Sequence, residues 1–259
     1  VKELNTKINT KLAETENLET VELRTLVEVG EDLVGLFKSG NSLVGFSKDK
    51  IFKIDKGSKS IEEIKGKNDT KSASVYDKWA FVNLGSEVYK IDLVNGNSEK
   101  AISGEKATDI AVFLGNVYLL GNDQIFKHTP FEGGYGDGTN YLIEGVQFDS
   151  ASRFAIDGSI WVTRGDQILN YLRGEKKDFA INGLTGGDLK LGAIFTEADT
   201  DSLYVVDTLN SALLVIGKDG IYGKSYQSPQ FKNATNLVVD EAGGKVYLAV
   251  GNKVLEADL

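Results

Sequence analysis

The chain has 259 residues and no cysteine, and 38 acidic against 29 basic side chains give it a net charge of −9. The lack of cysteine excludes disulfides, thiolate nucleophiles and cysteine-based zinc sites, and the scattered lysines make a nucleic acid an unfavourable partner. No window approaches the roughly 18 to 20 apolar residues that span a bilayer, so this segment is not expected to insert into a membrane.

The first predicted element is a polar helix or linker over residues 1–19, where Leu4, Ile8 and Leu12 form a narrow apolar stripe. A strand candidate follows at residues 20–29. The chain begins at Val1 and contains no methionine, which is consistent with a segment of a longer protein.

A repeated phrase of two short apolar runs around a polar turn dominates the rest of the chain. Its clearest copy is TDSLYVVDTLNSALLVIGKDG, residues 200–220. The equivalent positions of the six copies are Leu43, Trp79, Val117, Ile160, Leu203 and Val246, spaced by 36, 38, 43, 43 and 43 residues. A period near 40 with four strands per unit is typical of a propeller blade.

The sequence therefore predicts an all-β, six-bladed β-propeller over residues 20–259, built of four-stranded blades that begin near residues 33, 71, 107, 150, 189 and 233. Fourth strands are expected at SIEEI, NSEKAI, NYLIE, DFAING and IYGKSY. The sixth copy lacks a fourth strand because the sequence stops at Leu259. The N-terminal strand at 20–29 is expected to supply it and close the ring.

Other all-β architectures fit the strand pattern less well. A β-sandwich accommodates alternating strands but gives no reason for a sixfold phrase, and a parallel β-helix would repeat at a much shorter period. Propellers of five or seven blades remain as alternatives.

The segment VVDTLNSALLVIGKDGIYGKSY resembles the NHL-type blade phrase. In that phrase an aspartate and an asparagine frame a tight turn and a later Asp-Gly joins the third and fourth strands, positions held here by Asp207, Asn210, Asp219 and Gly220. Only this blade matches well, so the resemblance describes geometry more than function.

A second resemblance rests on EGGYGDGTNYLIEGVQFDSASRFAIDGSIWV, residues 132–162, together with the polar segment before the first blade. It is similar to propeller regions that follow a membrane helix in some bacterial PPM-type phosphatase-like proteins. This resemblance implies a sensor-like domain outside the membrane, at a bacterial cell surface in preference to the cytoplasm, and a tether through a preceding segment.

Several polar residues draw attention, but each has a plain structural interpretation. His128 is the only histidine and lies at the end of a predicted strand, as expected for a surface or strand residue. The loop at residues 129–140 carries Glu132, Asp137 and Asn140, but its spacing matches no known calcium loop, which favours a wide turn. The alternating acids from Glu197 to Asp201 fit a solvated hairpin.

Arg153 is the most informative polar residue, because it falls inside a predicted inner strand. Aligning the blades places it level with Ser74, Asp109, Gly192 and Asn236. Inner strands line the central channel of a propeller, so we expect Arg153, Asp109, Asn236 and Ser74 to form a polar ring that binds a ligand. An ion pair of Arg153 with Asp109 is the structural alternative.

Catalytic propeller signatures are not legible in the chain. Gluconolactonase-like enzymes need a Glu, Asn and Asp set around one metal, and sialidases need three converging arginines. The prediction is therefore a monomeric, non-enzymatic binding, sensing or protein-interaction module without cofactor or metal, whose partner is a protein or a small polar ligand. The alternative is a metal-dependent hydrolase of the lactonase type with its site in the central channel.

Overall fold

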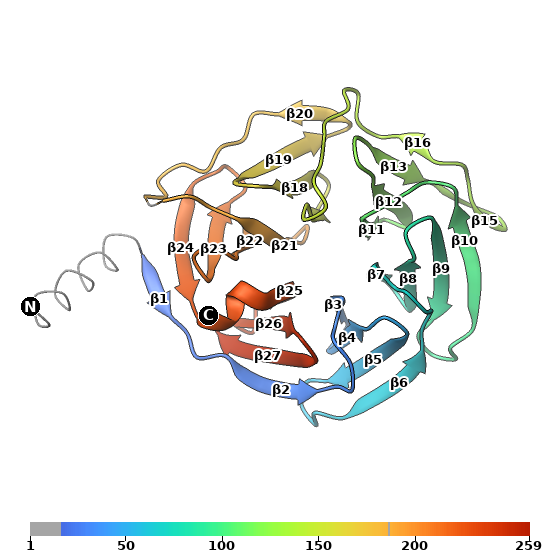
Figure 1. The fold of residues 1–259 in the computed structure, drawn as a ribbon, viewed down its shortest axis with the longest axis horizontal. Helices are drawn as coiled ribbons and strands as arrows, with labels where there is room; N and C mark the ends of the chain where they lie inside the picture. Colours follow the sequence, from blue (N-terminus) through green and yellow to red (C-terminus); the bar gives the residue numbers. More distant parts are fainter. Residues whose placement is uncertain (1–16, 186) are drawn as a thin grey trace, which may run out of the picture.

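The computed structural model describes residues 17–185 and 187–259, which form six β-sheets arranged as blades around a ring (Figure 1). The all-β, six-bladed prediction is confirmed. The innermost strands are β3 (Gly35–Ser39), β7 (Ser72–Tyr76), β11 (Asp109–Phe113), β17 (Phe154–Ile156), β21 (Leu191–Phe195) and β25 (Ala234–Asp240). Each contacts the next in this order, and β25 contacts β3, so together they surround a central channel.

The middle of each blade consists of two strands joined by a tight turn. From the first blade to the sixth they are β4 (Ser42–Phe46) and β5 (Lys50–Asp55), β8 (Trp79–Asn83) and β9 (Glu87–Asp92), β12 (Asn116–Leu120) and β13 (Ile125–His128), β18 (Ile160–Arg164) and β19 (Gln167–Leu172), β22 (Ser202–Asp207) and β23 (Ala212–Gly217), β26 (Lys245–Val250) and β27 (Lys253–Asp258).

The outer strands are less uniform than the inner ones. They are β6 (Ile61–Lys65), β10 (Ser98–Ser103), β16 (Thr139–Asn140), β20 (Glu175–Lys177), β24 (Tyr222–Gln227) and β2 (Arg24–Glu28). The third blade also carries a small hairpin, β14 (Pro130–Phe131) and β15 (Gly134–Tyr135), and a 3-10 turn, η1 (Pro229–Asn233), precedes β25.

The apolar core lies between adjacent blades. Side chains alternate between the two faces of a strand, so the phrase of two apolar runs covers both neighbours of each blade. Leu36 and Phe52 of the first blade, for example, share one cluster with Val238 and Tyr247 of the sixth. This packing explains why the phrase is repeated: each blade needs a similar neighbour to bury its faces.

The N-terminal strand closes the ring as predicted. Strand β2 pairs antiparallel with β27 and buries Leu26 and Val27 against the last blade. A shorter strand, β1 (Leu18–Thr20), was not predicted; it pairs parallel with β24 and gives the fifth blade a fifth strand (Figure 1). The helix or linker predicted for residues 1–19 otherwise lies outside the described residues.

The fourth strand of the fourth blade differs from the prediction. It was expected at residues 178–183 but is β20, Glu175–Lys177. The reason is the turn at Arg173 and Gly174, whose φ angles of 54° and 84° reverse the chain directly after β19. The sequence DFAING therefore leaves the sheet, and Phe179 packs edge-on against Trp161. In the third blade, the strand expected at NYLIE, residues 140–144, is instead the short β16, Thr139–Asn140, and overlaps it only at Asn140.

Buried aspartates shape several turns between strands. The Asp207 carboxylate accepts the backbone N–H groups of Leu209 and Asn210 and the Asn210 side-chain amide, and Gly220 has a φ of 88° in the following turn.

Among the described residues, no helix is long and apolar enough to cross a bilayer.

Candidate functional site

The central channel contains a cavity of about 210 Å³ that is lined by all six inner strands. Most of its lining residues are apolar, with Phe37, Phe154 and Phe195 among them. The polar or charged lining residues are Lys38, Ser74, Asp109, Thr196, Glu197 and Asn236. Three of the four predicted site residues, Ser74, Asp109 and Asn236, therefore line one cavity.

Asp109 is the only lining carboxyl group that is closely packed, with 8% of its surface exposed. Its Oδ1 accepts the N–H of Ile110 at 3.0 Å, and its Oδ2 accepts the N–H of Phe154 on the neighbouring blade at 3.3 Å. Burial raises the pKa of Asp109 to about 6, against the opposing effects of the Arg153 charge and these two backbone N–H groups. With this pKa, the Asp109 carboxyl group can exchange a proton near neutral pH.

Arg153 lies just before β17 and does not line the cavity. Its guanidinium donates to the carbonyl groups of Ser150 and Ser152, at 3.2 and 2.9 Å. No ion pair with Asp109 occurs among the described residues, so Arg153 acts on that carboxyl group through its charge alone. The ion pair considered from the sequence is not formed.

Ser74 and Asn236, the other predicted members of the ring that line the cavity, belong to the second and sixth blades. Ser74 Oγ accepts the N–H of Val112, three residues beyond Asp109 along β11, so Ser74 and Asp109 are not level. Asn236 lines the cavity, and no hydrogen bond to its side-chain amide occurs among the described residues. Gly192 does not line the cavity; its carbonyl accepts the Thr163 hydroxyl at 2.9 Å.

The sequence did not predict the charged pair at the far end of the channel. Lys38 Nζ lies 3.4 Å from Glu197 Oε2, and the two residues come from the first and fifth blades. Glu197 was assigned to a solvated hairpin, because the alternation of acids gave no sign that a lysine from a distant blade faces it. Asp109 begins an inner strand and Glu197 follows the end of another, so the two carboxylates lie toward opposite ends of the channel.

His128 ends β13, as expected, but it is buried instead of exposed. Its Nδ1 lies 3.0 Å from the Gly136 carbonyl, and its Nε2 lies 3.6 Å from Glu105 Oε2. Neither His128 Nε2 nor Glu105 Oε2 has a hydrogen-bond partner among the described residues. The pair anchors the insertion at residues 129–140 and is separate from the channel.

The donor set does not fit the metal centre required of a lactonase-type enzyme. Asp109 and Asn236 line the cavity, but the third donor, Glu197, is directed to Lys38 at the other end. The described residues contain no cluster of three or more His, Cys, Asp or Glu side chains that could hold a metal ion. The metal-dependent form of the lactonase alternative is not supported by these residues.

Comparison with known proteins identifies the fold but no family. No protein-family model and no curated protein sequence matches the chain, so the NHL and PPM-type resemblances are not confirmed. The chain is similar in structure to a gluconolactonase from Xanthomonas campestris, with a TM-score of 0.70 and 13% identity, covering 95% of this chain and 92% of that one.

Two other propellers are similar. A calcium-binding regucalcin from Agrobacterium tumefaciens gives a TM-score of 0.65 at 11% identity over 93% of this chain and 95% of that one. Virginiamycin B lyase from Staphylococcus aureus gives 0.61 at 13% identity over 93% and 99%. Identities this low establish a shared fold.

The prediction that the protein is not an enzyme is wrong, because the structural likeness to a gluconolactonase overturns its basis. That prediction rested on missing sequence signatures. The gluconolactonase shares the architecture of this chain at only 13% sequence identity. Missing motifs therefore do not exclude catalysis. Whether the channel can catalyse a reaction depends on the residues that line it.

Proposed function

We propose that this protein is a hydrolase of a small cyclic ester, a lactone, with its site in the central channel and Asp109 as the general base. The observation that carries the proposal is the Asp109 carboxyl group, buried at the cavity wall with its pKa raised to about 6. General bases work best when their pKa lies near the operating pH. The structural likeness to a gluconolactonase supports the choice of substrate class.

The chemistry assigns a role to two residues of the cavity. The Asp109 carboxylate accepts a proton from a water molecule as the water oxygen attacks the ester carbonyl carbon. The Asn236 amide donates a hydrogen bond to the carbonyl oxygen, where negative charge develops. When the ring C–O bond breaks, the proton held by Asp109 passes to the leaving alkoxide, which gives the open hydroxy acid and restores the carboxylate.

The dimensions of the cavity limit the substrate. A volume of about 210 Å³ lies below the roughly 300–1,000 Å³ of sites for drug-sized ligands. Aromatic side chains on the wall favour a ring with an apolar face, and Ser74 offers a hydroxyl to a substituent. A five- or six-membered lactone fits these limits.

The test is lactone hydrolysis followed by a pH indicator, with γ-butyrolactone, δ-valerolactone and glucono-δ-lactone as probes and spontaneous hydrolysis subtracted. We expect Asp109→Asn to lower kcat/KM for the accepted lactone by at least about 100-fold, as for loss of a general base. The exposed carboxylate of Asp137 provides the control, and Asp137→Asn should leave the rate unchanged.

The pH profile and a chelator provide independent checks. The wild-type rate should rise with pH around a midpoint of about 6, the pKa of Asp109, and should persist in EDTA. Activity that needs an added divalent cation would contradict the metal-free mechanism. Binding of the lactones without turnover would contradict the hydrolase and leave the channel as a binding site.

A further inference from the structure

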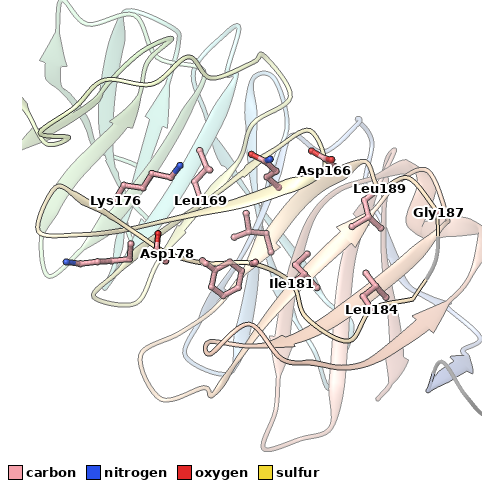
Figure 2. Close-up of a pocket in the computed structure, with 13 residues that line it drawn as sticks. Asp166, Leu169, Lys176, Asp178, Ile181, Leu184, Gly187 and Leu189 are labelled. Carbon is pink, nitrogen blue, oxygen red and sulfur yellow. The ribbon is translucent and has the colours of Figure 1, made fainter.

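A second cavity, of about 410 Å³, lies beside the third strand of the fourth blade (Figure 2). One side is β19, and the other is the segment after β20, which contributes Phe179, Ile181, Leu184 and Leu189. The side chains of Ile181, Leu184 and Leu189 lie around this space in Figure 2. The cavity is separate from the central channel and has no part in the proposed hydrolysis.

The cavity exists because the fourth blade has only half of its outer strand. Strand β20 pairs with Asn170–Leu172 and stops, so no strand in the described part of the chain pairs with the outer side of Gln167–Leu169 of β19. In the first blade, by contrast, the outer strand β6 accompanies β5 from Lys50 to Ile54. The cavity occupies the place where the missing half-strand would lie.

The geometry of the two turns shows which backbone groups are left open. Two-residue turns join Arg164 to Gln167 and Leu172 to Glu175, and the residues that flank such turns form hydrogen-bonded pairs. Because hydrogen-bonded and non-hydrogen-bonded pairs alternate along an antiparallel ladder, Ile168 directs its N–H and carbonyl away from β18. Toward that open side, neither group bonds to any described residue.

These open groups are not on an ordinary exposed edge. Ile168 is only 3% exposed, so its N–H and carbonyl lie in a recess instead of facing bulk water. A backbone group that is withdrawn from water without a partner costs free energy comparable to a lost hydrogen bond. A ligand that supplies one donor and one acceptor at strand spacing would recover that energy.

We propose that the cavity beside β19, called the slot below, binds an extended peptide segment of a partner protein. The peptide adds to β19 as the missing half of the fourth strand. The N–H and carbonyl of one peptide residue pair with those of Ile168, and an apolar side chain of the peptide enters the cavity between Ile181 and Leu184. Strand addition of this kind gains affinity from backbone hydrogen bonds and specificity from side-chain pockets.

The same molecule already completes other blades by adding strands from a distant part of the chain. Strand β2 supplies the outer strand of the sixth blade, and β1 adds to the complete fifth blade, where Asn17 bonds to the Gly223 carbonyl. The rim of the slot carries Asp166 and Asp178 together with Lys176 and Lys177. Because these charges balance, the peptide needs no net charge, and its apolar side chain is the main determinant.

The experiment titrates the ¹⁵N-labelled full chain with capped pentapeptides of the form acetyl-Thr-Thr-X-Thr-Thr-amide, with X as Leu, Phe or Ala. The Leu or Phe peptide should shift the Ile168 amide resonance and slow its hydrogen exchange at least 10-fold at saturation. The Ala peptide should bind at least 10-fold more weakly. Methylation of the backbone nitrogen of X should abolish binding, because it removes the donor to the Ile168 carbonyl.

A filled cavity provides the matched protein control. Leu184→Trp should weaken binding at least 10-fold, whereas Leu114→Trp, at an exposed position on the third blade, should not change it. An Ile168 amide that is already protected in the free protein would overturn the proposal. So would shifts that map outside the slot, equal binding of the Ala and Leu peptides, or no binding at millimolar peptide; these measurements on the unmodified chain remain decisive if Leu184→Trp does not fold.

Discussion

Two aspartates show how neighbouring groups, and not residue type, decide the chemistry of a side chain. The N–H of Val94 in a turn and the ammonium of Lys78 lower the pKa of Asp92. Asp109 also accepts two backbone N–H groups, but burial at the channel wall outweighs them and raises its pKa to about 6. Asp92 is thereby held as an anion that shapes a turn, and Asp109 is poised to exchange a proton.

The raised pKa of Asp109 predicts a pH dependence of stability. Because the folded state binds this proton more tightly than the unfolded state does, the stabilisation is present below about pH 4 and is lost as pH rises through about 6. The loss is up to about 3 kcal/mol, from two units of pKa. In urea unfolding, the stability of Asp109→Asn relative to the wild type should therefore increase between pH 4.5 and 7.5.

The expected signal is the change of this stability difference with pH and not the absolute stability of the variant. The amide loses one acceptor for the N–H groups of Ile110 and Phe154, a constant cost at every pH. A difference between the two proteins that stays constant across this range would contradict the assignment of the raised pKa to Asp109.

At the scale of the element, the N-terminal strands are unequal in what they bury. The residues of β1 are exposed or half-buried. Strand β2 and its flanks bury Leu23, Leu26, Val27 and Val29, and β2 covers the edge of β27. The ring is therefore closed chiefly by β2, and β1 is an added strand on a blade that is already complete.

Truncation should separate these two contributions. Relative to a chain that starts at Asn17, a chain that starts at Val21 loses only β1 and should lose about 1 kcal/mol, the scale of a few net hydrogen bonds and one exposed ion pair. A chain that starts at Gly30 also loses four buried apolar side chains, worth more than about 5 kcal/mol. Thermal melting of the three chains tests this order, and equal melting temperatures for the last two would contradict closure by β2.

At the scale of the whole molecule, aspartates at the ends of strands make the stability of the ring depend on pH in the opposite sense from Asp109. Asp55, Asp92 and Asp240 each accept backbone N–H groups of the turn that follows, which lowers the pKa of each carboxyl group. These turns belong to the first, second and sixth blades, so their loss would loosen the ring at several places at once.

Acid should therefore unfold the protein cooperatively. A lowered pKa contributes stability that is present above the unfolded value, about 3.9, and is lost as pH falls through the folded value. We expect the urea midpoint to fall steeply between pH 4 and 3, below the range in which protonation of Asp109 adds stability. A midpoint that is unchanged down to pH 3 would show that these turns do not depend on ionised aspartates.

The sequence by itself determined the architecture, because blade packing repeats. Each blade must bury two faces against similar neighbours, so the apolar phrase recurs near every 40 residues and the number of copies equals the number of blades. Ring closure by the N-terminal strand also followed, because the sixth copy lacks one strand. Asp109, Ser74 and Asn236 could be placed at the channel for the same reason, since they occupy similar positions in the repeat.

Only the tertiary structure decided the features that depend on contacts between residues far apart in the chain. Lys38 meets Glu197 across the channel, and Arg153 turns back to the carbonyl groups of Ser150 and Ser152 instead of pairing with Asp109. The shortened β20 follows from a turn whose left-handed Arg173 has no strong sequence signal. Register and side-chain direction arise from packing between blades, and the repeat pattern does not encode that packing locally.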